Sequence, residues 1–146
     1  MSLTDFQRPL NSRGKSDGPL MANHLSVKIN KIDYLHSSSS VRTFETSKFF
    51  INQIKFEKIE YDDALYHSSS RSILNMIKNY SEEYQSAVII AHNPGLTNFI
   101  NELTNISLDN LPTTGVAEIN FNCDNWKNIS IENSTLIDLK FPKQLK

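Results

Sequence analysis

The sequence predicts an α/β fold with three layers, in which helices cover both faces of a mostly parallel sheet. Segments of strand length alternate with segments of helical periodicity between residues 32 and 103. The segment 87–91 is apolar at every position, as a parallel strand covered on both faces requires. The residues from 116 onward read as strands alone. A length of 146 residues suits one domain, 1–146.

The first half of the chain predicts two helices and two strands. A polar loop covers residues 5–14, and the helix after it has Pro19 in its first turn and ends near Lys28. Residues 32–36 suit a short buried strand, 41–52 a helix, and 56–61 a strand of alternating polarity. The first helix is expected to bury Leu20, Met21 and Leu25.

The second half continues the alternation and then changes to strands. A helix is expected after the serines 68–70, because Ile73, Leu74, Ile77 and Tyr80 recur at helical spacing. The buried strand 87–91 leads directly into a helix over 96–103. The remaining strands are expected at 116–121, 129–131 and 136–141.

Composition excludes several classes of protein. The chain is 38% hydrophobic and 21% charged, which is typical of a globular protein rather than a disordered one. Its net charge of -1 does not favour nucleic acid as a partner. Since the start has no apolar run and no stretch reaches the length of a membrane span, we expect no membrane association and a cytoplasmic location. The lone Cys123 suits a small, partly buried side chain.

His92 is a candidate site residue, because it stands where a buried strand meets a helix. Ligands of open α/β sheets bind at the carboxyl ends of the strands. Asn93 can cap the new helix, and Pro94 suits its first position. The helix N-terminus then offers N–H groups to an anion. The alternative is a histidine that only ends a strand.

Arg42 is a second candidate, because it opens a helix directly after the serines 37–40 and Val41. Serine runs usually form loops, and one of these serines could also cap the helix. An arginine at a helix start opposes the helix dipole, and its planar fork matches phosphate oxygens. The alternative is an exposed surface arginine. If both residues serve one site, their tips should lie on the order of 5–8 Å apart, one phosphate's span.

Two further segments could contribute to binding an anion. Arg8 and Arg13 bring two cations to the first loop, although a solvated loop is the simpler interpretation of each. The turn at residues 113–115 offers hydroxyl and N–H groups through Thr114, in a pattern that is common in turns.

Taken together, these segments resemble the histidine phosphatase superfamily, which also contains the phosphoglycerate mutases. The similarity is greatest to its short phosphohistidine phosphatase branch, and it extends over nearly the whole chain in the family's order. The segments that carry it are Asp5-Phe6-Gln7-Arg8-Pro9-Leu10-Asn11-Ser12-Arg13-Gly14, Ser37-Ser38-Ser39-Ser40-Val41-Arg42-Thr43-Phe44-Glu45-Thr46, Leu65-Tyr66, His92-Asn93-Pro94-Gly95 and Leu111-Pro112-Thr113-Thr114-Gly115-Val116-Ala117.

The resemblance implies a fold, a reaction and a set of residues. It implies a phosphoglycerate mutase-like fold and a phosphatase that needs neither a metal nor a cofactor. A nucleophilic histidine takes the phosphoryl group of a phosphohistidine protein or a small-molecule phosphate, and water then hydrolyses the intermediate. Arg42 and His92 match an arginine and the second histidine that stabilise the transferring group. Arg8, Asn93, Gly95 and Thr114 are expected to bind substrate.

The sequence departs from the family at the nucleophile. In the family an Arg-His-Gly-like motif ends the first strand, just before the position of Asp5, and only four residues precede Asp5 here. None of His24, His36 and His67 has the family's context for a nucleophile, and His67 is expected to be exposed. We therefore expect little or no turnover from the chain as given. The alternatives are a non-catalytic phosphate- or phosphopeptide-binding module and an inactive fragment.

The absent strand is central in the family's sheet. Without it, two neighbouring strands should expose their backbone edges beside a hole in the core. A truncated gene product, a start codon placed too late, or another segment or subunit that fills the gap would each account for this arrangement.

Overall fold

The computed structural model describes residues 3–146, which form four α-helices and five strands. The helices are α1 (Ser12–Lys28), α2 (Val41–Gln53), α3 (Ser70–Lys78) and α4 (Gly95–Thr104). The strands are β1 (Lys31–Ser38), β2 (Lys55–Asp62), β3 (Ala87–Ile90), β4 (Val116–Phe121) and β5 (Ser134–Lys140). Short 3₁₀ turns at Asp63–Leu65, Trp126–Asn128, Ile131–Asn133 and Pro142–Leu145 complete the described chain.

The strands form two sheets. β1 lies between β2 and β3 in a parallel sheet, with Leu35 opposite Ile59 on one side and Val88 on the other. β4 and β5 form a separate antiparallel pair. The α/β class with a parallel sheet is confirmed. The prediction had one mostly parallel sheet, whereas the structure divides the strands between a parallel sheet and an antiparallel pair.

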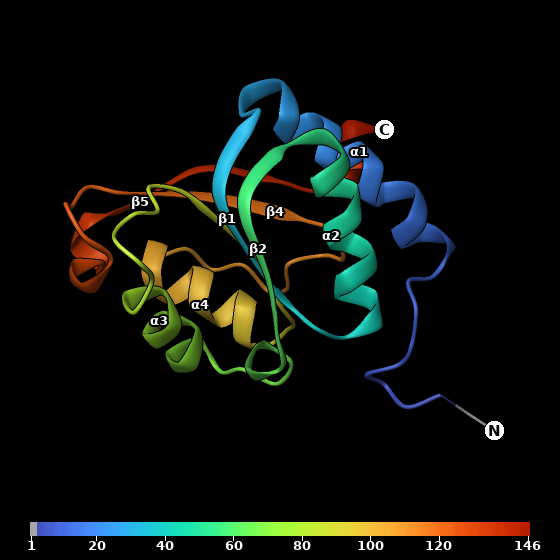
Figure 1. Ribbon diagram of the computed structural model, residues 1–146, viewed down its shortest axis with the longest axis horizontal. Helices are drawn as coiled ribbons and strands as arrows, with labels where there is room; N and C mark the ends of the chain where they lie inside the picture. Colours follow the sequence, from blue (N-terminus) through green and yellow to red (C-terminus); the bar gives the residue numbers. More distant parts are fainter. Residues whose placement is uncertain (1–2) are drawn as a thin grey trace.

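Helices cover both faces of these strands, which confirms the three-layer arrangement (Figure 1). One hydrophobic cluster joins α1, α2 and β1 through Met21, Phe50 and Ile32. The other joins α3 and α4 through Ile73 and Phe99. No helix among residues 3–146 has the length and apolar character needed to cross a membrane.

Helix α1 begins earlier than the sequence indicated. The Asn11 side chain accepts a hydrogen bond from the Gly14 N–H at 2.9 Å and caps a helix that starts at Ser12, so Pro19 lies inside the helix. A Cβ on Gly18 would stand 2.1 Å from Phe49 of α2, so the missing side chain lets the two helices approach closely. Pro19 is exposed and does not interfere with this contact.

The serine run is only partly a loop. β1 continues through Ser37 and Ser38, and both side chains are fully buried together with Ser40. The prediction that a serine caps the next helix is confirmed, because the Ser40 hydroxyl accepts the Thr43 N–H. The loop prediction was wrong for the first two serines, whose buried hydroxyls have hydrogen-bond partners: Ser37 Oγ donates to the Ser38 carbonyl at 2.9 Å, and Ser38 Oγ accepts from the Ser40 N–H at 3.3 Å.

The predicted strand over residues 129–131 is wrong. Ile129 is buried in the α3–α4 cluster from an irregular segment between two 3₁₀ turns. The Asn133 side chain accepts the Ser130 N–H at 3.0 Å, which holds the chain in a turn and delays β5 until Ser134. Ile129 is therefore apolar because it packs in the hydrophobic core, and it is not part of a β-strand.

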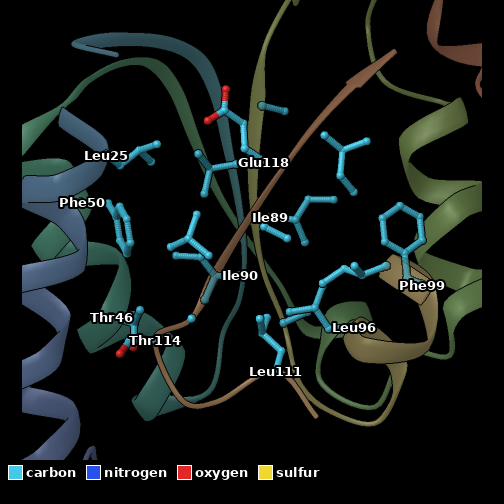
Figure 2. A pocket seen from close by; sticks show the side chains of 18 of the residues that line it. Leu25, Thr46, Phe50, Ile89, Ile90, Leu96, Phe99, Leu111, Thr114 and Glu118 are labelled. Carbon is cyan, nitrogen blue, oxygen red and sulfur yellow. The ribbon is translucent and has the colours of Figure 1, made fainter. Parts of the chain in front are cut away.

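A cavity of about 610 Å³ lies between the two sheets. Residues of both β3 and β4 line it, among them Ile89, Ile90 and Glu118 (Figure 2). Leu25 and Phe50 close it toward α1 and α2, whereas Leu96 and Phe99 close it toward α4. We call this cavity the strand slot. It matches the expected hole in the core beside the strand edges.

Candidate functional site

The candidate site lies where β1 and β3 end. Arg42 stands in the first turn of α2, after β1, and His92 follows β3. Although the two residues are 50 positions apart, Arg42 Nη2 lies 3.5 Å from His92 Nδ1. This separation is shorter than the expected span of a phosphate. Parallel strands produce the convergence, because their carboxyl ends meet at one edge of the sheet.

Two serine hydroxyls surround the other ring nitrogen of His92. Nε2 lies 2.9 Å from Ser38 Oγ and 3.5 Å from Ser40 Oγ. Since Arg42 can only donate, Nδ1 is the acceptor and Nε2 carries the hydrogen that points to Ser38. Burial, reinforced by the nearby Arg42 cation, lowers the pKa of His92 below its usual range. The imidazole is therefore neutral at pH 7.

Sequence reasoning missed Ser38 as a site residue. It treated the serine run as loop and helix cap, so no serine stood on a strand. The available signal was the end of an apolar strand followed directly by hydroxyl residues, because the last side chains of a parallel strand lie at the ligand-binding edge.

An internal carboxylate already binds Arg42. Nη1 donates to the backbone carbonyl of Asp5 at 2.8 Å and to Asp5 Oδ1 at 3.1 Å, and Nη2 donates to Oδ2 at 3.4 Å. The Tyr66 hydroxyl also donates to Oδ2. Tyr66 and Arg42 together hold the pKa of the Asp5 carboxyl below its usual range, and Asp5 raises the pKa of Tyr66. Asp5 thus presents to Arg42 the oxygen pair that a phosphoryl group would present.

Asn93 and Gly95 shape the start of α4. The Asn93 amide donates to the Leu111 carbonyl at 2.9 Å, and its Oδ1 accepts from the Thr97 N–H at 3.2 Å. Asn93 is not the N-cap that the sequence predicted, because that position is occupied by Pro94. The helix starts at Gly95, so Pro94 precedes its first position instead of occupying it. A Cβ on Gly95 would stand 2.0 Å from the Ser68 carbonyl oxygen. Asn93 and Gly95 thus make structural contacts at the end of β3, next to His92.

Arg8 and Thr114 lie at the rim. Arg8 is exposed in the turn that begins at Asp5, close enough for its charge to contribute to the lowered pKa of Asp5. Thr114 lines the strand slot and has a φ of 61°, in the left-handed region. Its hydroxyl donates to the Thr113 carbonyl at 2.6 Å. Their roles toward substrate remain predictions.

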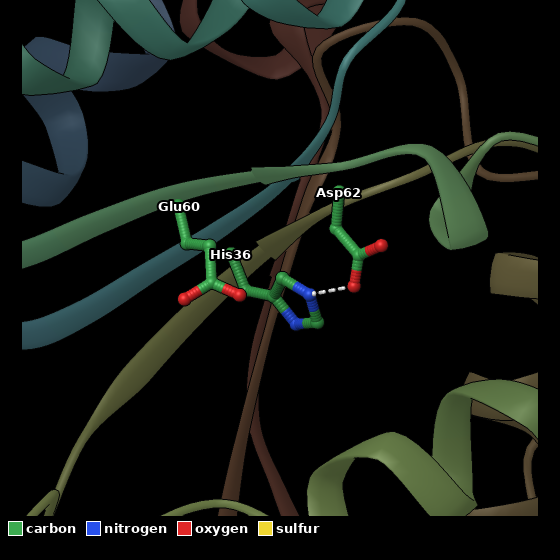
Figure 3. Close-up of side chains that lie close together, drawn as sticks. All are labelled: His36, Glu60 and Asp62. Carbon is green, nitrogen blue, oxygen red and sulfur yellow. Dashed lines mark hydrogen bonds and ion pairs between the residues drawn. The ribbon is translucent and has the colours of Figure 1, made fainter.

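His36 belongs to a separate hydrogen-bonded group (Figure 3). Its buried ring contacts the Tyr80 hydroxyl through Nδ1 at 2.7 Å and Asp62 Oδ2 through Nε2 at 2.8 Å. The bond from His36 lowers the pKa of Asp62. His36, Glu60 and Asp62 each offer a ligand atom within 4.8 Å of the others, so this is the place where the described residues could hold a metal ion.

The two remaining histidines stand apart from Arg42. His24, in α1 as expected, lies 3.6 Å from Asp138 of β5. His67 is exposed, also as expected, and its ring packs on Tyr66 with a centroid distance of 4.0 Å. Tyr66 in turn meets the His92 ring edge to face at 5.1 Å. Among residues 3–146, His92 is the histidine within hydrogen-bonding reach of Arg42 and Ser38.

A known protein sequence is similar to this chain over nearly its whole length. No family model matches the chain. An uncharacterized protein of Mycobacterium leprae, ML1117, is 23% identical over 151 residues, which cover 97% of this chain and 91% of that protein. The name of this relative gives no activity.

Solved structures share the fold. A proposed phosphohistidine phosphatase SixA from Nakamurella multipartitia superposes with a TM-score of 0.83 at 16% identity, over 97% of this chain and 89% of that one. A proposed SixA from Agrobacterium tumefaciens gives 0.79 at 24%, over 97% and 88%. The protein histidine phosphatase SixA complexed with tungstate gives 0.76 at 20%, over 100% and 92%. The chain therefore has the fold of these SixA structures, an α/β fold of the phosphoglycerate mutase-like type.

Proposed function

We propose that this chain is a cytoplasmic phosphatase of the histidine phosphatase superfamily that acts on phosphohistidine in a protein or on a small-molecule phosphate. The observation that carries the proposal is the 3.5 Å approach of Arg42 to His92 at the carboxyl edge of the parallel sheet. The fold shared with SixA proteins supports it, and one of those structures holds tungstate, an oxyanion that resembles phosphate.

The side chains present can bind and polarise a phosphoryl group without a metal. The Arg42 fork pairs with two phosphoryl oxygens once the Asp5 carboxylate is displaced. The neutral His92 ring carries one N–H, on Nε2, which points to Ser38 in the free chain and would turn from Ser38 to a phosphoryl oxygen when substrate binds. Both contacts strengthen as negative charge gathers on the equatorial oxygens during transfer.

Turnover also needs a nucleophile. A ring nitrogen of a second histidine would attack phosphorus, the bond from phosphorus to the leaving nitrogen would break, and the leaving imidazole would take up a proton. Water would then attack the phosphohistidine and release phosphate. None of His24, His36 and His67 shares the hydrogen-bonded group of Arg42, Ser38 and His92 in the described part of the chain. A phosphate- or phosphopeptide-binding module is therefore the second candidate, and little turnover is expected without an added nucleophile.

Binding and hydrolysis can be measured separately. Calorimetric titration with tungstate should show a single site, and Arg42→Ala should weaken it about 10- to 100-fold, as expected for charged hydrogen bonds. Arg71→Ala is the matched control, because Arg71 is exposed on α3. Equal tungstate affinity in Arg42→Ala and the unaltered chain would refute the site.

Hydrolysis of phosphohistidine separates the enzyme from the binding module. Turnover that is lost in His92→Ala would support the enzyme. Tungstate binding without turnover would support the module. Release of phosphate that survives His92→Ala and Arg42→Ala would come from a different site and would refute this proposal.

A further inference from the structure

One face of the parallel sheet carries a histidine and two carboxylates where it meets a helix. His36 of β1 lies opposite Glu60 of β2, and Asp62 follows two positions further along β2. Successive side chains of a strand point to opposite faces, so the three residues share one face. Met76 of α3 and Tyr80 line the same open groove of about 380 Å³ as these residues. Polar groups at such a contact cost free energy unless partners compensate for the lost water.

The three side chains bring one ligand atom each to the same point (Figure 3). The side chain of His36 is only 4% exposed, and its Nε2 lies 2.8 Å from Asp62 Oδ2. A carboxylate oxygen of Glu60 lies within 4.8 Å of both atoms. The ligand atoms of a tetrahedral zinc ion stand about 3.4 Å apart. The carboxylates of Asp62 and Glu60 are 31% and 47% exposed, so both can move the short distance that this geometry requires.

Tyr80 orients the His36 ring. Its hydroxyl lies 2.7 Å from His36 Nδ1, and burial raises the pKa of Tyr80, so the phenol stays neutral. A neutral imidazole with its hydrogen on Nδ1 donates to the Tyr80 oxygen and leaves the Nε2 lone pair for a metal. Histidines that bind a metal almost always hold an oxygen through the other ring nitrogen in this way.

The charges of the group are suited to a divalent cation. The bond from His36 lowers the pKa of Asp62, which favours the carboxylate form. The Lys58 ammonium lies 3.8 Å from the Glu60 carboxylate, and both side chains are largely exposed, so this ion pair is weak. An ion with two positive charges would balance both carboxylates at once.

We propose that His36, Glu60 and Asp62 bind a zinc ion, with water from the groove as the fourth ligand. One imidazole nitrogen with two carboxylate oxygens is a donor set that zinc accepts, whereas Mg²⁺ prefers oxygen ligands alone. The inference is independent of the proposed phosphatase function, because none of the three residues belongs to the hydrogen-bonded group of Arg42 and His92.

Calorimetric titration of the full chain with ZnCl₂ in phosphate-free buffer tests the ligands. Glu60→Gln and Asp62→Asn should each weaken Zn²⁺ binding by about 10-fold or more. Asp62→Asn keeps an oxygen for the Ala64 N–H that Asp62 Oδ1 accepts at 2.9 Å, so the turn after β2 is preserved. Glu57→Gln is the matched control, because Glu57 lies on the other face of β2 and pairs with Lys31 at 3.0 Å. Equal Zn²⁺ affinity in all three variants would overturn the proposal.

Two comparisons separate this site from other modes of binding. Mg²⁺ should bind about 100-fold more weakly than Zn²⁺, and equal affinities would indicate a diffuse anionic surface and overturn the proposal. Tungstate affinity should be the same in Glu60→Gln and the unaltered chain, because the anion site uses other residues. A loss of tungstate binding in Glu60→Gln would overturn the independence of the two sites.

Nuclear magnetic resonance of the imidazole nitrogens tests the location. One equivalent of Zn²⁺ should shift the Nε2 signal of His36 and leave the hydrogen on Nδ1. The ring signals of His24, His67 and His92 should not change. A shift confined to those three histidines would overturn the proposal, because the ion would then lie outside the groove.

Discussion

Asp5→Asn should raise the affinity of the Arg42 site for a phosphate-like anion. The Asp5 carboxylate accepts from both terminal nitrogens of Arg42 and from the Tyr66 hydroxyl. An incoming oxyanion needs the same donors, so the carboxylate competes with it. Asparagine keeps the size of the side chain and the backbone contact to Arg42, and removes the charge.

The contacts of Asp5 decide the size of the effect. The Asp5 side chain is 54% exposed, and its contacts to Arg42 range from 2.8 to 3.4 Å, with the shortest made by the backbone carbonyl. The backbone contact survives the substitution. Exposed ion pairs are weak, so the gain in tungstate affinity should be about 1.5- to 5-fold. This is smaller than the loss expected from Arg42→Ala, because the tungstate contacts themselves depend on Arg42.

The assay is calorimetric titration with tungstate at pH 7 and low salt, repeated in 0.5 M NaCl. Screening should reduce the difference between the variant and the unaltered chain. Asp124→Asn is the matched control, because it removes the same charge at the opposite end of β4 from the site. An Asp5→Asn affinity equal to or below that of the unaltered chain would refute the competition. A matching gain in Asp124→Asn would show that net charge alone is responsible.

Three further outcomes are expected from the same contacts. Tyr80→Phe should lower the free energy of unfolding in urea by about 1–3 kcal/mol, because it leaves buried His36 Nδ1 without its partner, and Tyr84→Phe is the control. The pKa of His92 is lowered from the ordinary histidine value of 6.5, so the unfolded chain binds more protons than the folded chain just below that pH. The contribution of His92 to thermal stability should therefore fall as the pH drops through 6.5. His92→Gln should remove this pH dependence of the melting temperature. EDTA should leave tungstate affinity unchanged, because Arg42 and His92 bind the anion directly, and a loss on chelation would require a cation at the site.

Local signals in the sequence were enough for the layers and for two site residues. The alternation of strand and helix patterns predicted the three-layer fold. His92 and Arg42 could be found because each stands at a junction between a strand and a helix, where position follows from topology. Ser40 could be predicted as a cap because capping involves only near neighbours in the chain.

Features that depend on distant partners could not be predicted. The first helix was expected to have Pro19 in its first turn, yet it begins at Ser12, and Gly18 within it packs against Phe49 of α2, a contact between distant segments that no local pattern indicates. Asp5 lies against Arg42 through a contact across 37 positions that no local pattern indicates. The bonds from His36 to Tyr80 and Asp62 likewise join three segments, so the sequence alone left His36 without a role.

The charge pattern of the strand edges has a consequence for aggregation. The outer strand β2 exposes Lys55, Glu57, Lys58 and Glu60, and charges of this kind discourage edge-to-edge pairing with other molecules. β3 carries no charge, because Val88, Ile89 and Ile90 follow Ala87. The outer edge of the parallel sheet is thus protected by its own side chains, whereas its inner edge depends on what stands opposite. Aggregation of this protein at high concentration should therefore start from β3. Removing one charge from β2 should promote aggregation less than widening the space beside β3 would.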